Sequence, residues 1–213
     1  MSTVEAEKRA AAEEAAALVE DGMLLGLGTG STVAYLLAAL AGRELSLRCI
    51  STSPRTEAAA RALGLAVEPF DTVDRLDLAI DGADQVDPAG WVVKGGGAAH
   101  TREKVVASAS DRFVVIVSSD KLVEAIAPPI PLELLPFGIP ATLRTLGLAE
   151  LRGGPPSPDG GVIADYVGPV GDPSELAERL STIPGVVEHG LFPPELVSEV
   201  LVGRNGRVDR LVA

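Results

Sequence analysis

The hydrophobic positions in the first 128 residues switch repeatedly between two periods. Short apolar runs that fit the two-residue period of a strand are 23–26, 45–50, 67–70, 76–80, 91–93 and 113–117. Longer segments with helical spacing, or rich in Ala and Glu, are 4–20, 33–41, 54–63 and 98–108. Strands that alternate with helices are typical of a mainly parallel sheet covered by helices, so we predict an α/β fold.

Prolines mark a change of pattern after residue 127, at Pro128, Pro129, Pro131 and Pro136. Beyond them the patterns predict strands at 132–135, 162–167 and 186–191, helices at 141–150 and 174–180, and a Pro/Gly turn at 153–161. Asn205-Gly206 between the apolar runs 199–202 and 208–212 predicts a hairpin. We interpret this part as a smaller α+β unit, a lid or an oligomerisation element, in which His189 has no metal-ligand partner at suitable spacing.

Composition limits the classes of partner. A net charge of −12 argues against nucleic acid or an anionic membrane surface, because both require a basic face. Cys49 is the only cysteine, lies in an apolar run and is expected to be a buried thiol in a reducing compartment. Residues 22–42 carry no charge, but three glycines, a serine and two threonines interrupt them, which disfavours a transmembrane helix. With an acidic start that is unlike a signal peptide, we expect a cytoplasmic protein.

The turn from Gly28 to Thr32 joins a predicted strand to a predicted helix. Backbone N–H groups, hydroxyls and the positive end of the helix would all face one point there, which is typical of an anion site. The alternative is a tight strand-to-helix turn with a hydroxyl cap. A dinucleotide site is disfavoured, because Ser31 stands where the last glycine of that fingerprint would fall and residues 51–53 offer no acid for a ribose.

Residues 81–104 concentrate the candidate chemistry. Asp81 and Asp84 follow a predicted strand, and the carboxyl ends of strands are where open α/β sheets bind ligands. Lys94 precedes the glycines 95–97, which allow close approach of a ligand to backbone N–H groups, and Glu103 lies on the following helix.

The stretch DGADQVD followed by KGGGAAHTREK resembles the ribose-5-phosphate isomerase A family, whose members carry DGAD and KGGG with REK eight residues after the lysine. The resemblance implies a Rossmann-like, mainly parallel sheet with a smaller ferredoxin-like α+β domain, the former from 1–128 plus 203–213 and the latter from 129–202. It implies isomerisation of ribose 5-phosphate to ribulose 5-phosphate through an enediolate, without cofactor or metal, in a homodimer.

The resemblance also implies roles for single residues. Glu103 would be the base, kept ionised by Lys94 and the helix N-terminus. Asp81 would open the sugar ring and shuttle hydroxyl protons. Lys94 would stabilise the oxyanion, and Asp84 would have an orienting role. The residues expected to bind substrate or its phosphate are Lys8, Thr29, Gly30, Ser31, Thr32, Gly82, Ala83, Gly95, Gly96, Gly97 and Lys121.

The sequence departs from the family pattern at three positions. Gln85 stands where the family usually has Glu, His100 where it has an apolar residue, and Ser118 where it has an aspartate before the substrate-site lysine. His100 is close enough to the expected site to alter its titration. Two alternatives stay open: a sugar-phosphate sensor, which would dispense with Glu103, and an amino-sugar phosphate deaminase, which would release ammonia.

Overall fold

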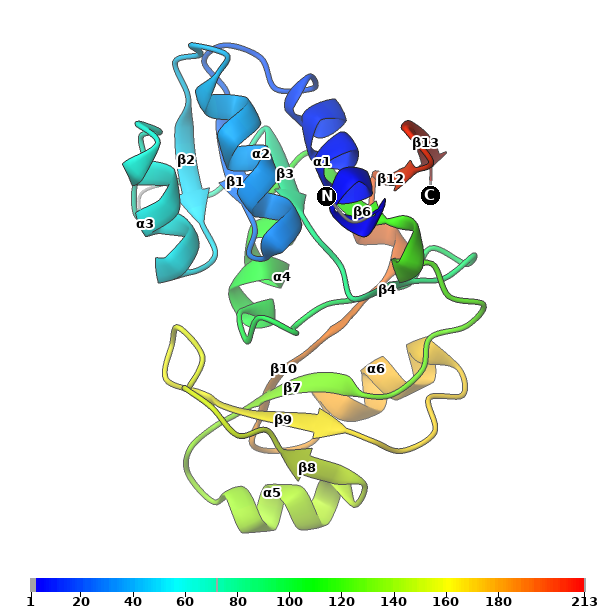
Figure 1. Cartoon of the computed structure of the whole chain (residues 1–213). Coiled ribbons are helices and arrows are strands. Elements are labelled where there is room, and N and C mark those ends of the chain that lie inside the picture. Colours follow the sequence, from blue (N-terminus) through cyan, green and yellow to red (C-terminus); the bar gives the residue numbers. More distant parts are fainter. Residues whose placement is uncertain (1–2, 72, 213) are drawn as a thin grey trace.

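A six-stranded sheet forms the centre of the larger of two units in the computed structural model, which describes residues 3–71 and 73–212 (Figure 1). Its spatial order is β13-β12-β6-β3-β1-β2, and every neighbouring pair is parallel except β12 with β13. The strands are β1 (Leu24–Leu27), β2 (Arg48–Ser51), β3 (Leu78–Asp81), β6 (Phe113–Ser118), β12 (Glu199–Arg204) and β13 (Arg207–Val212). The predicted Rossmann-like sheet is therefore confirmed.

Helices cover both faces of this sheet. They are α1 (Thr3–Ala16), α2 (Ser31–Ala41), α3 (Pro54–Ala62) and α4 (His100–Ser108). The alanines of α1 and the leucines of α2 form one core with Leu25, Leu27 and Ile80. On the other face, Val106 of α4 packs with Phe113, Val115 and Phe192.

Two predictions in this unit were wrong in detail. The first helix ends at Ala16 and not at residue 20, because residues 17–18 form a turn. The predicted strand 67–70 is reduced to a single bridge between Val67 and Cys49.

The smaller unit is a four-stranded antiparallel sheet of order β10-β7-β9-β8 with two helices. Its elements are β7 (Ile130–Leu134), α5 (Ile139–Leu146), β8 (Ala149–Leu151), β9 (Val162–Tyr166), α6 (Pro173–Ser181) and β10 (Val186–His189). This βαββαβ sequence with that strand order is ferredoxin-like, as predicted. The predicted helix 141–150 was wrong at its end: α5 stops before Gly147, whose φ is 75°, and the next residues form β8.

A small sheet of order β11-β5-β4 joins the two units. It consists of β4 (Gln85–Val86), β5 (Val92–Val93) and β11 (Leu191–Phe192), and β11 pairs with β5. The predicted strand 186–191 is thus split at Gly190, with β10 in the smaller unit and β11 beside the larger one. The division at 129 and 203 remains a prediction, although β12 runs in the six-stranded sheet from Glu199 onward.

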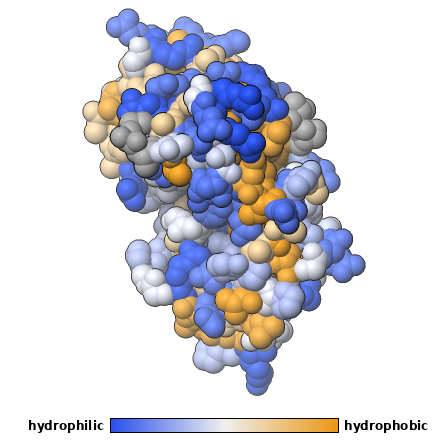
Figure 2. Space-filling model, turned by 45° about the vertical axis from the view of Figure 1, so that its right-hand side comes forward, coloured by the Kyte–Doolittle hydropathy of each residue, from blue (hydrophilic) through white to orange (hydrophobic). Residues whose placement is uncertain are grey.

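The molecule has two lobes separated by a waist (Figure 2). Two 3-10 turns, η1 (Ser119–Lys121) and η2 (Pro194–Leu196), follow β6 and precede β12. No helix within residues 3–71 and 73–212 is both long and apolar enough to cross a membrane.

Candidate active site

The candidate site lies where β1 and β3 end side by side. The two strands are parallel, with Leu27 opposite Ile80, so the turn after β1 and Asp81 meet at one edge of the sheet. Gly28 is required there, because a Cβ at its position would lie 1.9 Å from the Asp81 carboxyl carbon. Asp81 accepts hydrogen bonds from the backbone N–H groups of Thr29 at 3.0 Å and Gly82 at 2.7 Å. The glycine turn and the DGAD motif thus form one structure.

Three buried ionisable side chains meet beside this edge. The Lys94 ammonium lies 2.7 Å from Asp81 Oδ2 and 3.2 Å from Glu103 Oε2, and each of the three side chains is at most 4% exposed. Lys94 also donates to the carbonyl oxygen of Gly82 at 2.6 Å. Glu103 lies in the first turn of α4, which starts at His100 and not at residue 98. Sequence analysis correctly expected these three residues to meet.

The cluster holds two carboxyls and one ammonium, so one excess negative charge is buried. Burial, followed by the charge of Asp81, raises the pKa of Glu103 to about 8, although Lys94 opposes the shift. Burial by itself would lower the pKa of Lys94, but Asp81 and Glu103 outweigh it and the pKa is raised. Burial raises the pKa of Asp81 as well, although Lys94 and the backbone N–H groups of Gly82 and Thr29 oppose the shift, so both carboxyls of the cluster resist ionisation. The direction of the pKa shift of Glu103 is opposite to the expectation that Lys94 and the helix N-terminus favour an ionised Glu103.

Asp84 faces the same space from the loop after β3. Its Oδ2 accepts the N–H of Gly96 at 2.8 Å, which ties it to the triple-glycine loop. Its own N–H donates to Val93 O at 2.8 Å, so both loops are held together by the small sheet.

The glycine turn presents the start of α2 to the cavity. Gly30 precedes α2, which starts at Ser31, and no side-chain cap occupies its N-terminus. The Thr29 hydroxyl is instead bonded to Thr52 Oγ1 at 2.9 Å and Ser53 Oγ at 2.8 Å. Thr29 therefore braces the turn with its side chain, a role that the sequence analysis missed together with Thr52 and Ser53.

Two further lysines reach this cavity from separate elements. The Lys8 ammonium comes from α1 and pairs with Glu5 at 2.7 Å, and Lys121 comes from η1, 3.9 Å from Asp120. Buried Glu7 holds η1 in place by accepting the N–H and hydroxyl of Ser119. The sequence around Glu7 does not predict this contact, because Glu7 and Ser119 are 112 positions apart.

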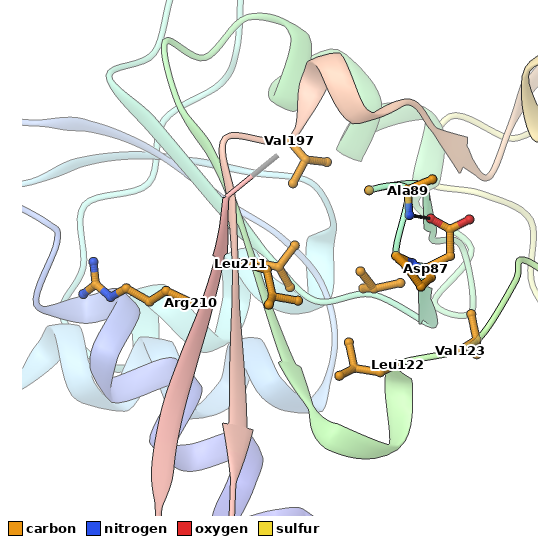
Figure 3. Close-up of a pocket in the computed structure, with 11 residues that line it drawn as sticks. Asp87, Ala89, Leu122, Val123, Val197, Arg210 and Leu211 are labelled. Carbon is orange, nitrogen blue, oxygen red and sulfur yellow. Dashed lines mark hydrogen bonds between the residues drawn. The ribbon is translucent and has the colours of Figure 1, made fainter.

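All but one of the predicted site residues line a single cavity of about 160 Å³, and Asp81 lies buried behind it. The lining residues are Lys8, Thr29, Gly30, Ser31, Thr32, Gly82, Ala83, Asp84, Lys94, Gly95, Gly96, Gly97, Glu103 and Lys121. A larger cavity, about 640 Å³, lies between β4, residues 122–123 and the hairpin (Figure 3). Its lining is mostly apolar. The Asp87 carboxylate accepts the N–H of Ala89 in its own turn, and Arg210 points away from the cavity and donates to Glu14. We therefore place the chemistry in the smaller, charged cavity.

The histidines do not add charge to the cavity. Burial lowers the pKa of His100 to about 4, so the departure from the family pattern at this position places a neutral ring behind Gly95. Burial and the charge of Lys104 likewise lower the pKa of His189 to about 4. Lys104 of α4 donates hydrogen bonds to Glu188 Oε1 and to His189 O, both at 2.7 Å, so a half-buried ion pair that the sequence analysis did not expect joins α4 to the smaller unit.

The sequence profile of ribose 5-phosphate isomerase A (phosphoriboisomerase A) matches residues 48–207. The chain belongs to the ribose 5-phosphate isomerase A family. A ribose-5-phosphate isomerase A from Natronomonas pharaonis is 45% identical over 96% of both chains, and one from Thermosynechococcus vestitus is 42% identical over 92% of this chain and 90% of the other.

Solved isomerase structures have the same fold. The ribose 5-phosphate isomerase A of Methanocaldococcus jannaschii matches with a TM-score of 0.91 and 36% identity, over 97% of this chain and 98% of that one. A D-ribose-5-phosphate isomerase in complex with phospho-erythronic acid matches with a TM-score of 0.93 and 35% identity over both full chains. The chain is accordingly an isomerase, and the family supports interconversion of ribose 5-phosphate and ribulose 5-phosphate.

Proposed function

We propose that the charged cavity interconverts D-ribose 5-phosphate and D-ribulose 5-phosphate through an enediolate, with Glu103 as the base. The observation that carries the proposal is the Lys94 ammonium placed between Asp81 and Glu103, 2.7 and 3.2 Å away, at the wall of a cavity that also holds an open helix N-terminus. An isomerase needs a base, an acid and a cation, and these side chains supply all three.

In the open-chain aldose, Glu103 would remove the proton from the carbon next to the carbonyl. The electron pair of that bond forms the double bond of the enediolate, and the carbonyl oxygen becomes an anion beside Lys94. The Glu103 carboxyl then returns the proton to the former carbonyl carbon, while the neighbouring hydroxyl passes its proton to the former carbonyl oxygen and becomes the ketone, so that the old carbonyl ends as a hydroxyl. Asp81 would open the ring and pass protons between the hydroxyls, and Asp84, tied to Gly96, would orient them.

The raised pKa of Glu103 suits this role. A carboxyl with a pKa of about 8 is a stronger base than an ordinary glutamate, and it can both take and return a proton near neutral pH. Binding of the phosphate next to Lys8, Lys121 and the α2 N-terminus would leave Lys94 free for the sugar oxygens.

The ligand of a solved relative supports the same placement. Phospho-erythronic acid is a sugar-acid phosphate, and its planar carboxylate has two oxygens on one carbon, much as the enediolate has oxygens on adjacent carbons.

The test is turnover of ribose 5-phosphate by the purified protein in the presence of a chelator, compared with Glu103→Gln. The substitution keeps the shape and removes the base, so kcat should fall about 10²- to 10⁴-fold with little change in KM. Glu57→Gln is the control, because Glu57 is an exposed glutamate of α3 paired with Arg61. Near-normal kcat in Glu103→Gln would refute the role of Glu103 as the base. Binding of the sugar phosphate without any turnover by the wild type would indicate a sensor instead.

A further inference from the structure

Arg152 brings the smaller unit into contact with the triple-glycine loop. It directly follows β8, and its Nη1 donates to the carbonyl oxygen of Gly95 at 2.8 Å, across 57 positions of sequence. Its side chain is 26% exposed, so most of the guanidinium is enclosed between the two units.

Contacts within the smaller unit fix the orientation of the guanidinium. Asp165 of β9 accepts hydrogen bonds from its Nε at 2.9 Å and from its Nη2, a two-pronged pairing that fixes the plane of the group. The backbone N–H of Arg152 is bonded to Ile163 O at 2.9 Å, which anchors the residue to the sheet. Asp165, through hydrogen bonding and charge, and Asp84, through charge, raise the pKa of Arg152, so the group is always cationic.

The contact falls on the residue that gives the loop its turn. Gly95 has a φ of 117°, in the region that only glycine adopts readily, and its carbonyl oxygen accepts the hydrogen bond from Arg152. The residue before Gly95 is held by the segment between β10 and β11, because the N–H of Lys94 donates to Gly190 O at 2.9 Å. The residue after it binds Asp84 through Gly96 N–H at 2.8 Å. Three consecutive residues are therefore held by hydrogen bonds: Lys94 by Gly190, Gly95 by Arg152 and Gly96 by Asp84.

We propose that Arg152 is a positioning residue for the isomerase reaction, which holds Lys94 and Asp84 in place through the carbonyl of Gly95. The inference rests on the proposed function. Among the described residues, the cavity lining does not include Arg152, so it acts through the loop and not on the substrate. The ferredoxin-like unit would thus contribute to catalytic geometry and not merely cover the site.

Three variants test the role of the guanidinium. Arg152→Ala removes it, Arg152→Lys keeps the charge without the two-pronged geometry, and Asp165→Asn weakens the orientation of the native arginine. Misplacement of catalytic groups by about 1 Å can cost about a hundredfold in rate, so we expect kcat to fall about tenfold to a hundredfold in Arg152→Ala, with KM within about twofold. Arg152→Lys should recover little of the rate, and Asp165→Asn should fall in between.

A matched control exists on the same junction. Arg102 of α4 makes the same two-pronged pairing with Asp159 of the smaller unit, at 2.8 and 2.7 Å, but it does not touch the glycine loop. Arg102→Ala should therefore keep the wild-type kcat. Added guanidinium chloride, at a concentration that leaves the thermal unfolding midpoint unchanged, should restore part of the kcat of Arg152→Ala, whereas sodium chloride of equal ionic strength should not.

The outcomes separate this inference from the proposed function. A wild type without turnover would overturn the function itself. With an active wild type, an unchanged kcat in Arg152→Ala would overturn the positioning role, and so would an equal loss in Arg102→Ala or a loss that guanidinium fails to restore. If Arg152→Ala does not fold, Arg152→Lys and Asp165→Asn decide the question by the same comparison of kcat with KM.

Discussion

Glu103 is a carboxyl surrounded by protein atoms, with a second carboxyl and an ammonium as its neighbours. Removal from water penalises its charged form, and Asp81 adds repulsion, so its pKa rises to about 8. Sequence spacing alone favoured an ionised Glu103, because proximity to Lys94 can be expected from the motif whereas complete burial cannot. In the free enzyme the pKa of Glu103 therefore lies well above that of an ordinary glutamate.

This raised pKa predicts the pH dependence of the reaction. In the proposed mechanism Glu103 acts only when ionised, so kcat/KM should rise as pH increases through about 8 and level off above it. The second ionisation of a phosphate lies near pH 6, so a rise caused by the substrate would fall about two pH units lower. Steady-state rates over this range provide the measurement. The residual activity of Glu103→Gln should lack the rise near 8, and a rise that persists in this variant would assign it to another group.

The glycine turn and the start of α2 line the part of the cavity where we propose that the phosphate binds. Thr32 is buried in the first turn of α2 and lines the cavity, and Lys8 approaches it from α1. A phosphate keeps its charge throughout the isomerisation, so contacts to it stabilise the substrate and the transition state alike. The hydroxyl of Thr29 is already bonded to Thr52 and Ser53, and it serves the shape of the turn.

We therefore expect Lys8→Ala and Thr32→Val to raise KM more than they lower kcat. A hydrogen bond to a charged group contributes about 1.5–3 kcal/mol, which corresponds to roughly a tenfold to a hundredfold change for Lys8. Arg9→Ala is a suitable control, because Arg9 is a neighbouring cation on α1 that lies over the Tyr35 ring, 5.2 Å from its centroid, and not at the cavity. Unchanged KM in both Lys8→Ala and Thr32→Val would place the phosphate elsewhere.

On the scale of the whole molecule, two surfaces connect the lobes. The small sheet pairs β11 with β5, and α4 is bonded to the smaller unit through Arg102 with Asp159, Lys104 with Glu188 and Thr101 with buried Glu133. Phe192 of β11 lies between the two clusters, 5.6 Å from the Lys94 ammonium and 5.0 Å from that of Lys104. The Phe192 ring therefore contacts an ammonium of the candidate site and one of the junction between the lobes.

The family resemblance predicts a homodimer, and the surface offers apolar area for it. A band of apolar side chains runs along one side of the waist (Figure 2), and the smaller unit exposes Phe137 at 84% and Leu148 at 54%. Exposed apolar area of this kind favours association. We expect light scattering to report about twice 21.9 kDa at micromolar concentration, and Phe137→Glu to weaken the dimer. Leu63→Glu, at an exposed site directly after α3, is the control, and a wild-type mass near 21.9 kDa would contradict the prediction.

The sequence by itself determined the elements and the order of the motifs. Periods of two and 3.6 residues locate most strands and helices because they follow from local backbone geometry. Asp81, Lys94 and Glu103 meet because the strand, the glycine loop and α4 that carry them are consecutive, and the turn after β1 reaches the same edge because parallel strands end together. The first relation is local, and the second follows from the general rule that parallel strands share an edge, so both can be predicted from the pattern along the chain.

Only the tertiary structure decided the relations between distant segments. Whether residues 186–192 form one strand or two depends on which sheets they meet, and the end of the helix predicted at 141–150 depends on the sheet that β8 joins. Arg152 contacts Gly95 across 57 positions, and Glu7 holds Ser119 across 112. The raised pKa of Glu103 depends on how many atoms exclude water from it. Burial and long-range contacts are properties of the packed molecule, because each depends on every segment that surrounds the residue.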